Sequence, residues 1–397
     1  MKKKILMLLP NGFDPDPRVH NEARSLVEAG YLVTILCWDR DVKYKEHEDI
    51  DGIQIERIFV SSSYGRGSSQ LRYLWRFWKE AYKRALIKTP DVIHAHDFNT
   101  LPLGYWLGKR LKIPVIFDAH ESYHEMLADN VHPLIKWTIA RIERFLIKRI
   151  DLLITVGSIL EEEYGRRGAR RTIVIGNWKR LEDFRFSEAE IKNARKELGI
   201  PENSLIISFV GYLLFSRGLL TLIEAVRSEK GVFLVIGGKG PLEDKISEAI
   251  KNADNIRYLG YTVPDKIPLI TSVSDVIYYG LKNNLGNNKY SAPNKLFEAL
   301  AAGKAILTCN NGEIARIVKE EKCGISLNKF SKETLLDAFK RLRNVRLINT
   351  YKDNAHQAGI NKYNWSNAEK TLLGVYDKIV NNRANIAMNY HSRPIKN

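Results

Sequence analysis

Residues 176–190, GNWKRLEDFRFSEAE, are a polar break in an otherwise regular alternation of apolar and amphipathic segments. Before the break, short apolar runs such as PVIFDAH (114–120) alternate with segments whose apolar residues recur every three or four positions. The same alternation restarts at LIISFVG (205–211). Such runs are typical of buried strands, and such segments are typical of helices. Because alternating strands and helices indicate parallel sheets covered on both faces, we predict an α/β protein with two doubly wound domains that face a central cleft.

The break also sets the predicted domain boundaries. We expect an N-terminal Rossmann-like domain at residues 1–175, a linker at 176–187 and a C-terminal Rossmann-like domain at 188–362. A last helix is expected at 363–380, and residues 381–397 are expected to form a flexible tail because they have little to bury. Ligands of doubly wound sheets bind at the carboxyl ends of the strands, so the informative residues should follow strands.

The composition restricts the class of protein. A chain of 397 residues with a formal net charge of +16 is too long for one core and implies an anionic partner, such as a nucleic acid, a membrane surface or a phosphate-bearing ligand. Its three scattered cysteines indicate a reducing compartment. The apolar run from Ile5 to Leu9 is too short for a secretory signal, and no run is long enough to span a bilayer. We therefore expect a cytoplasmic protein.

The segment YSAPNKLFEALAAG (290–303) places a cation at the start of a predicted helix. Proline fits the first helical position and glycine follows a helix end, so we expect the helix to begin at Pro293 and to end before Gly303. Lys295 would be the third helical residue, although the start of a helix is electrically positive and favours acidic side chains. Either Lys295 is an ordinary exposed lysine, or an anion bound at this end is held by both the lysine and the helix.

Two further strand-to-helix turns in this half combine glycine with a cation. FVGYLLFSRGLL (209–220) offers Ser216 as a helix cap and Arg217 as the first helical residue. VIGGKGPLEDK (235–245) has glycines that would expose backbone N–H groups to a phosphate. An anion with about two charges, such as a diphosphate, would explain all three turns. The glycines concerned are Gly211, Gly237, Gly238 and Gly240.

The histidines allow two interpretations. HAHD (94–97) and DAHESYH (118–124) could form a metal site from His94, His96, His120 and His124. Alternatively, His94 packs inside the sheet and His120 points from a strand end into the cleft. Because the four histidines do not specify a tetrahedral set, we favour the second interpretation and expect no metal ion.

A basic helix is predicted at residues 71–88, LRYLWRFWKEAYKRALIK. One side is expected to be an apolar stripe, and the other carries six cations against Glu80. This profile is typical of a helix on an anionic membrane, or of a helix that packs on the sheet and leaves its charges in water. We find no motif for nucleic-acid binding and expect that nucleic acid is not a partner. The predicted stripe is Leu71, Leu74, Trp75, Trp78, Ala81, Tyr82 and Ala85.

Taken together, several segments resemble a known family. These are DVIHAHD (91–97), a strand that ends at His120, VIGNW (174–178), VIGGKGP (235–241) and PNKLFEALAAGKAIL (293–307). They resemble the retaining nucleotide-sugar glycosyltransferases of the GT-B fold, a family that includes sucrose synthases and phosphatidylinositol mannosyltransferases. The resemblance covers nearly the whole chain and implies a GT-B fold in which the last helix returns to the N-terminal domain.

The resemblance also implies roles for particular residues. His120 would lie near the reacting carbon, Lys295 and Arg217 would face the diphosphate, and Glu298 would hold the ribose. Two positions depart from the family, because Tyr290 stands where a glutamate contacts the donor sugar and Tyr212 stands where an arginine is usual. The implied donor-binding residues are Glu298, Ser291, Asn294, Tyr290, Gly211, Gly237, Gly238 and Gly240, and the implied acceptor-side residues are Gly12 and Arg18.

The implied function is transfer of a sugar, with retention of configuration, from a nucleotide diphosphate sugar to a lipid-linked or glycan acceptor in cell-surface polysaccharide or glycolipid synthesis. The expected enzyme is a hexosyltransferase that needs no cofactor or metal, uses a UDP or GDP donor and contacts an anionic membrane peripherally through residues 71–88. The alternatives are a catalytically impaired homologue that binds a partner, a nucleotide-sugar epimerase and, on charge alone, a nucleic-acid-binding protein. The base, the sugar, the acceptor and the oligomeric state cannot be read from the sequence.

Overall fold

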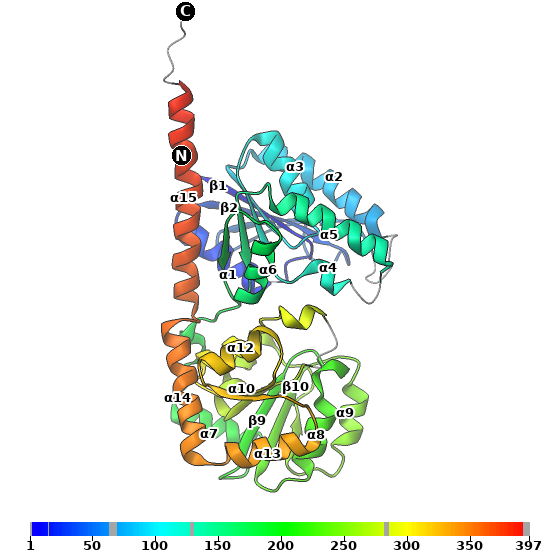
Figure 1. The fold of residues 1–397 in the computed structure, drawn as a ribbon, viewed down its shortest axis with the longest axis vertical. Coiled ribbons are helices and arrows are strands. Elements are labelled where there is room, and N and C mark those ends of the chain that lie inside the picture. The colour runs from blue at the N-terminus through cyan, green and yellow to red at the C-terminus, as the bar shows by residue number, and fades with distance from the viewer. Residues whose placement is uncertain (1, 15, 63–69, 128–130, 282–285, 392–397) are drawn as a thin grey trace, which may run out of the picture. The chain divides into compact units, whose positions relative to one another are not determined.

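The computed structural model describes residues 2–14, 16–62, 70–127, 131–281 and 286–391. The chain divides into two compact units (Figure 1). The first contains residues 1–175 together with 369–397, and the second contains residues 176–368. Each unit is an α/β structure built around one sheet, so the predicted fold class is confirmed.

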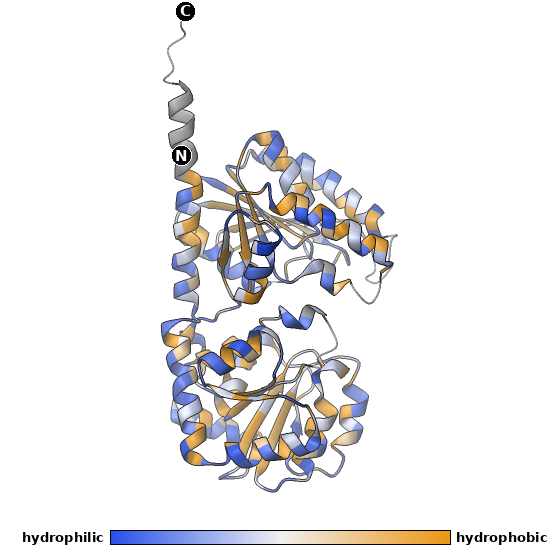
Figure 2. Ribbon diagram, in the orientation of Figure 1, coloured by the Kyte–Doolittle hydropathy of each residue, from blue (hydrophilic) through white to orange (hydrophobic). Residues whose placement is uncertain are grey.

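The first unit contains an eight-stranded sheet in the order β3-β4-β2-β1-β5-β6-β7-β8. Figure 2 shows that its strands are mostly hydrophobic and that its helices are hydrophobic on one side, as burial between two layers requires. The strands are β1 (Lys4–Leu9), β2 (Leu32–Asp39), β3 (His47–Ile50), β4 (Ile53–Phe59), β5 (Val92–His96), β6 (Val115–Ala119), β7 (Leu152–Thr155) and β8 (Thr172–Val174). The helices are α1 (Pro17–Glu28), α2 (Gln70–Lys88), α3 (Leu101–Leu111), α4 (Tyr123–Met126), α5 (Pro133–Ile147), α6 (Ser158–Arg166) and most of α15 (Trp365–His391).

One edge of this sheet differs from the parallel arrangement expected. Strand β3 pairs antiparallel with β4, and neither strand was predicted. Asp51 and Gly52 connect them with φ angles of 53° and 79°. An Asp-Gly pair with two positive φ angles is typical of a tight hairpin turn, so a local signal for this hairpin was present in the sequence.

The second unit contains a six-stranded parallel sheet in the order β11-β10-β9-β12-β13-β14. Its six strands include the one predicted at LIISFVG (205–211). They are β9 (Leu205–Val210), β10 (Val232–Gly237), β11 (Ile256–Tyr258), β12 (Val276–Tyr279), β13 (Ala305–Cys309) and β14 (Gly324–Leu327). The α-helices are α7 (Glu188–Glu197), α8 (Leu219–Arg227), α9 (Glu243–Ala249), α10 (Ile267–Val273), α11 (Asn294–Ala301), α12 (Gly312–Glu320), α13 (Lys332–Leu342) and α14 (Val345–Asn361). Short 3-10 helices are η2 (Leu181–Phe184), η3 (Phe215–Arg217), η4 (Pro264–Lys266) and η5 (Gly286–Lys289).

The last helix, α15, belongs to the first unit from Glu369 onward. The Ser25 hydroxyl donates to Glu369 at 2.5 Å, and the buried Tyr376 hydroxyl hydrogen bonds to His94 Nδ1 at 2.7 Å. The helix runs to His391, past the end expected at residue 380, because no glycine or proline interrupts it between Gly374 and Pro394. Residues 392–397 of the expected tail lie outside the described part of the chain.

Helix α2 buries a different stripe from the one predicted. Its buried residues are Tyr73, Phe77, Ala81 and Ala85, because the Phe77 ring stacks on Trp38 of β2 with centroids 5.4 Å apart. The predicted stripe shares only the two alanines with this set. Leu71 and Trp75 are consequently 65% and 58% exposed. Within the described residues, no helix has both the length and the apolar character that crossing a membrane would need.

Candidate active site

Lys295 lies in the first turn of α11, close to its predicted place. The helix begins at Asn294 with Pro293 as its N-cap, so Lys295 is the second helical residue and not the third. Pro293 has a ψ of 147°, which is outside the helical range, and this moves the start by one residue. No acidic side chain occupies the first turn. Gly303, with a φ of 61°, follows the end of the helix as expected.

The ammonium group of Lys295 lies against the backbone at the end of β9. A Cβ added to Gly211 would lie 2.6 Å from Lys295 Nζ, so the glycine leaves the space that the lysine occupies. Nζ is 5.4 Å from the centroid of the Phe209 ring. Burial lowers the pKa of Lys295, and the nearby Arg217 and Lys179 lower it further, against the opposing effect of Glu298. Among the described residues, no acceptor is within hydrogen-bonding distance of this ammonium.

Arg217 is brought close to Lys295 by a turn that differs from the predicted one. It ends the 3-10 helix η3, and α8 begins after Gly218, whose φ is 67°. Ser216 therefore does not cap a helix. The Arg217 guanidinium lies 4.4 Å from the Tyr279 ring centroid, and its Nη1 is buried without a hydrogen-bond partner in the described part of the chain.

A third cation, Lys179, was missed by the sequence analysis. Its ammonium donates to the Asn294 side chain at 2.7 Å and lies 4.0 Å from Glu298 Oε1. Burial lowers its pKa, although Glu298 and Asp183 oppose this. Lys179 lies in the linker, and nothing in its local pattern marks it as a ligand-binding residue. Arg217, Lys179 and the Glu298 carboxylate, which is only 8% exposed, thus all lie near Lys295.

Other predicted donor-binding residues surround this group. Ser291 lies beside Tyr279, and Asn294 is held by Lys179 as described above. Tyr290 is buried at 7% exposure, whereas Tyr212 is exposed at 65%. An excess of cations over carboxylates at the end of β9 and at a helix start is the electrostatic arrangement of an anion site.

The glycine-rich turn after β10 does not use its amides as predicted. The Gly238 N–H donates to the Gly260 carbonyl at 2.7 Å, and the Gly240 N–H donates to Glu243 Oε1 at 2.9 Å. These two amides are therefore already used within the protein. A side chain at Gly238 would collide with the Gly211 carbonyl, and one at Gly240 would lie 2.7 Å from the Leu213 backbone. The glycines let two loops pack closely, and Gly237 similarly leaves room for Thr262.

In the first unit, Arg18 and Asp118 form a buried ion pair. Arg18 donates through Nε and Nη2 to both carboxylate oxygens of Asp118 at 2.8 Å, and through Nη1 to the Ile175 carbonyl at 2.6 Å. Arg18 is only 7% exposed, so it supports the unit from inside and is not free to contact an acceptor as predicted. Gly12, also predicted on the acceptor side, accepts from Arg57 Nε at 2.8 Å and lies against Tyr44.

His120 directly follows β6 and is held between two carboxylates. Its Nε2 lies 3.3 Å from Asp118 Oδ2, and its Nδ1 lies 3.7 Å from Asp97 Oδ1. Burial alone would lower the pKa of His120, but Asp97 and Asp118 outweigh it and raise the pKa to about 10. The imidazole therefore carries a positive charge at neutral pH and can donate a hydrogen bond but cannot act as a general base.

Four buried side chains of this unit are close enough to hold a metal ion. Glu22, His94, His96 and Asp118 have ligand atoms within 4.8 Å of one another. Both Glu22 carboxylate oxygens, His94 Nε2 and His96 Nε2 lack a hydrogen-bond partner among the described residues. However, the Arg18 guanidinium already uses both oxygens of Asp118 and lies 3.4 Å from Glu22. It supplies the positive charge that a metal would bring.

Shifted pKa values also reduce the charge of this cluster, because they favour a protonated Glu22 and unprotonated histidines. Burial and Asp118 raise the pKa of Glu22 well above its usual range, and burial lowers the pKa of both His94 and His96. His94 is packed in the sheet as we favoured, with its ring 4.3 Å from that of His96. The side chain of His124, the fourth histidine considered for a metal, lies outside the described residues. The absence of a metal ion stays a prediction.

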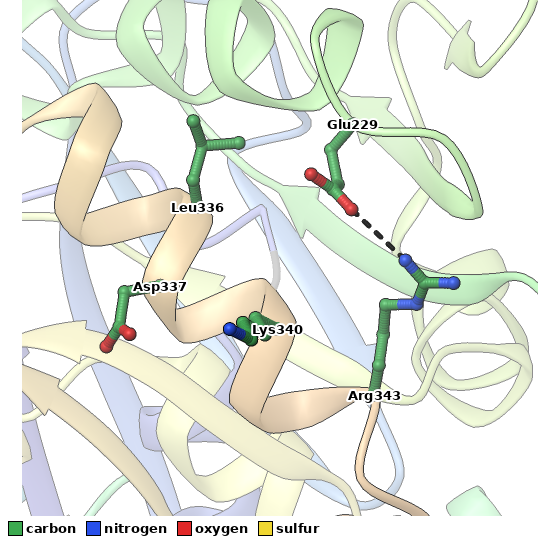
Figure 3. Close-up of a pocket in the computed structure, with 5 residues that line it drawn as sticks. All are labelled: Glu229, Leu336, Asp337, Lys340 and Arg343. Atoms are coloured by element: carbon green, nitrogen blue, oxygen red, sulfur yellow. Dashed lines mark hydrogen bonds and ion pairs between the residues drawn. The ribbon is translucent and has the colours of Figure 1, made fainter.

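A cavity of about 400 Å³ elsewhere in the second unit contains no predicted site residue. It is lined by α13 and by the turn after α8 (Figure 3). Its charged pair is already satisfied, because Arg343 Nη1 lies 3.1 Å from Glu229 Oε1. We assign it no role in the chemistry.

Comparison with known proteins identifies related sequences and folds. Residues 15–178 match the family described as "Glycosyl transferase 4-like domain", and residues 190–363 match "Glycosyl transferases group 1". The chain is 23% identical over 318 residues to alpha-monoglucosyldiacylglycerol synthase of Streptococcus pneumoniae, an alignment that covers 75% of this chain and 68% of the relative.

Two solved structures share the GT-B architecture across nearly the whole chain. Sucrose-phosphate synthase from Thermosynechococcus elongatus has a TM-score of 0.78 at 17% identity and covers 95% of this chain and 99% of its own. HepE of Anabaena, solved in complex with UDP, has a TM-score of 0.73 at 17% identity and covers 95% of this chain and 100% of its own.

The buried ion pair predicts a large loss of stability when one partner is removed. Arg18→Met leaves Asp118 buried without its main counter-charge, so we expect the free energy of unfolding to fall by about 3–5 kcal/mol. Arg24→Met is the matched control on the same helix, because the Arg24 side chain is 43% exposed and pairs with Glu28, and it should cost under about 1 kcal/mol. Urea unfolding measures both. Equal losses for the two variants would contradict the assigned role of Arg18.

The raised pKa of His120 predicts a pH dependence of stability. Its charge stabilises the folded state fully below about pH 6.5, and this contribution is lost as the pH rises through about 10. The stability difference between wild type and His120→Gln, measured by urea unfolding, should therefore be largest near pH 6 and shrink toward pH 10. His47→Gln, at a side chain that is 63% exposed, should show a small difference throughout. A pH-independent loss for His120→Gln would refute the charged imidazole.

Proposed function

The chain belongs to the glycosyltransferases of the GT-B fold, and we propose that it moves a hexose, with retention of configuration, from a nucleotide diphosphate sugar to a lipid-linked or glycan acceptor. The observation that carries the proposal is the group of three cations formed by Lys295, which lies against Gly211 at the end of β9, and the nearby Arg217 and Lys179. The UDP complex of HepE supports a uridine nucleotide as the donor, and GDP is the other base considered.

The three cations suit the leaving group of this reaction. Negative charge builds up on the diphosphate as the bond to the sugar breaks, and fixed positive groups aimed at that charge stabilise the transition state. Lys295 is held against Gly211 and has no hydrogen-bond acceptor among the described residues, so its ammonium is available to a phosphate oxygen. An incoming anion also removes the electrostatic cost that lowers the pKa of Lys295. We propose that these cations and the start of α11 take the place of a divalent metal.

Glu298 and His120 have separate proposed roles. Glu298, held near Lys179, would accept hydrogen bonds from the ribose hydroxyl groups. His120, protonated between Asp97 and Asp118, would donate a hydrogen bond to the transferred sugar. Retention is proposed to follow from attack on the face that the diphosphate leaves, without an enzyme carboxylate as nucleophile.

An acceptor in a membrane is supported by the surface of the first unit. Helices α2, α3 and α5 pack side by side (Figure 1). Trp75 and Trp106 meet edge to face with centroids 6.2 Å apart and are both exposed. Exposed basic and apolar residues on neighbouring helices are typical of binding to an anionic bilayer. The exposed apolar residues are Leu71, Trp75, Ile87, Trp106, Leu134, Ile135, Trp137, Ile142 and Phe145.

The relative from Streptococcus pneumoniae, whose name is that of a glucolipid synthase, supports a glycolipid product. We propose that the protein acts in cell-surface polysaccharide or glycolipid synthesis on the cytoplasmic face of a membrane.

The donor assignment predicts nucleotide binding without metal. UDP or GDP should raise the melting temperature of the protein in EDTA, by mass action on the folded state. Lys295→Ala should remove most of this shift and lower donor turnover by about 100-fold or more. Lys329→Ala, at an exposed lysine on the loop before α13, should leave both quantities unchanged.

The same measurements separate the alternatives. Failure of every nucleoside diphosphate to stabilise the folded protein would favour an impaired homologue. Tyr290 and Tyr212, which replace a glutamate and an arginine usual in the family, motivate this alternative. Conversion of the donor sugar without any acceptor would indicate an epimerase. The anomeric configuration of a transferred sugar, read by NMR, tests retention directly.

The membrane assignment predicts a charge-dependent affinity for lipid. Arg76, Lys79 and Lys83 are exposed on α2, and each cation near an anionic surface contributes about 1 kcal/mol. Replacing all three with glutamine should therefore weaken sedimentation with phosphatidylglycerol vesicles by up to about 100-fold. Changing Lys245, Lys251 and Lys329 to glutamine removes the same charge from the second unit and should have little effect. Equal weakening by the two triple variants would show only a general charge effect.

A further inference from the structure

The second unit contains a larger cavity near the amino ends of its strands, whereas Lys295 lies at the carboxyl end of β9. It has a volume of about 900 Å³ and is bounded by α7 and by the segment that leads into β9. Ser272 of α10 and Lys304, directly before β13, also line it. Helices α7 and α10 pack against each other in this part of the unit (Figure 1). Ile206 near the start of β9 lines the cavity, whereas Gly211 follows the end of that strand. A strand of this length separates the two regions by about 17–20 Å.

The floor of the cavity has more positive charge than its carboxylates can balance. Lys304, directly before β13, lines the cavity and is partly buried. Among the residues that the structure describes, no acceptor lies within hydrogen-bonding distance of its ammonium. Burial, together with Lys352 and Arg195, lowers the pKa of Lys304 to about 8, against the opposing effect of Asp275.

Asp275, the nearby carboxylate, is already occupied. One oxygen accepts from the Ile206 amide at 2.9 Å, and the other accepts from Lys352 at 2.7 Å and lies 3.7 Å from Arg195. Arg195 is oriented by a hydrogen bond of 3.0 Å from its Nε to the Val273 carbonyl. Three cations therefore lie near one carboxylate, and within the described part of the chain Lys304 is the one whose ammonium makes no hydrogen bond or ion pair.

The rim adds cations and acids in equal number. Lys192 and Lys196 of α7 line the cavity together with Glu188 and Glu202, so the rim is neutral and the surplus is confined to the floor. Ser272, which is only 3% exposed and donates its hydroxyl hydrogen to the Phe184 carbonyl at 3.4 Å, also lines the cavity. A floor with two surplus positive charges suits a compact anion, and the volume is within the range of small-molecule sites.

We propose that this cavity is a second anion site that binds a small phosphate-bearing molecule, with Lys304 and Arg195 as its contacts. The phosphate would accept a hydrogen bond from the free Lys304 ammonium and from the outer nitrogens of Arg195. It would restore the charge balance that Asp275 alone cannot provide. The site is separate from the cations around Lys295, and the inference does not depend on the proposed transfer reaction.

Calorimetric titration of the whole chain with inorganic pyrophosphate tests this site. Wild type and Lys295→Ala should both show saturable binding at the cavity, and Lys304→Met should raise the dissociation constant of that event at least about tenfold, the loss of one charge-assisted hydrogen bond. Arg195→Gln should weaken the same event, and Lys329→Met, at an exposed lysine outside the cavity, should not. Thermal melting confirms that each variant is folded.

Loss of binding in Lys304→Met with retention in Lys295→Ala supports the second site, whether or not any nucleotide binds. Equal affinity in wild type and Lys304→Met, or binding that disappears in Lys295→Ala alone, would overturn it. Absence of pyrophosphate binding to the wild-type protein would also overturn it.

Discussion

The first unit depends on one requirement, that the buried carboxylate of Asp118 must have positive partners. An isolated ionised carboxyl group inside a protein is too costly to persist. Arg18 meets the requirement from α1 with two hydrogen bonds, and it also reaches the Ile175 carbonyl at the end of the unit. His120 completes the set from the strand end. One carboxylate therefore joins the first helix, the sixth strand and the last residue of the unit's main segment, and it also fixes the charge of His120.

The second unit shows the opposite electrostatic arrangement. Among the described residues, cations here outnumber the nearby carboxylates, around Lys295 at the carboxyl ends of the strands and around Lys304 at their amino ends. Burial of such groups lowers the pKa of both lysines, so the folded protein carries them at a cost that a bound anion would remove. Perturbed groups of this kind concentrate at functional sites, and the net charge of +16 is thus partly organised into sites and not spread evenly over the surface.

The sequence predicted the features that are local in the chain. The parallel strands of both halves, the helix that starts near Pro293 and the cation in its first turn all follow from periodicity and from proline and glycine positions. Features that join distant segments were beyond such reasoning. Arg18 and Asp118 are 100 residues apart, so nothing near Arg18 shows that its charge is used internally. Lys179 reaches Glu298 from the linker by the same kind of long-range contact.

Two further errors have physical causes that a pattern cannot resolve. The stripe predicted on α2 includes Trp75 and Trp78, whereas the structure packs Phe77 against Trp38 and leaves Trp75 exposed. The glycines after β10 were predicted to expose N–H groups to a phosphate. In the structure, the lack of a side chain at Gly238 instead lets its backbone approach that of Gly211 closely. Periodicity indicates which residues are apolar or small, but the neighbouring surface decides which of them are buried.

Helix α11 has a lysine near each of its ends. Lys304 follows the carboxyl end, where a cation is favourable, whereas Lys295 lies in the first turn, where the helix opposes it by a few tenths of a kcal/mol or more. The helix cannot rotate to move Lys295 into water, since Leu296 to Ala301 are all buried and the Gly359 backbone of α14 packs against Leu300. Because the Lys295 ammonium group is fixed in place, its electrostatic attraction for an anion at this position is not weakened by movement of the side chain into water. Such fixed charge, and not the number of cations, is what electrostatic stabilisation of a developing anion requires.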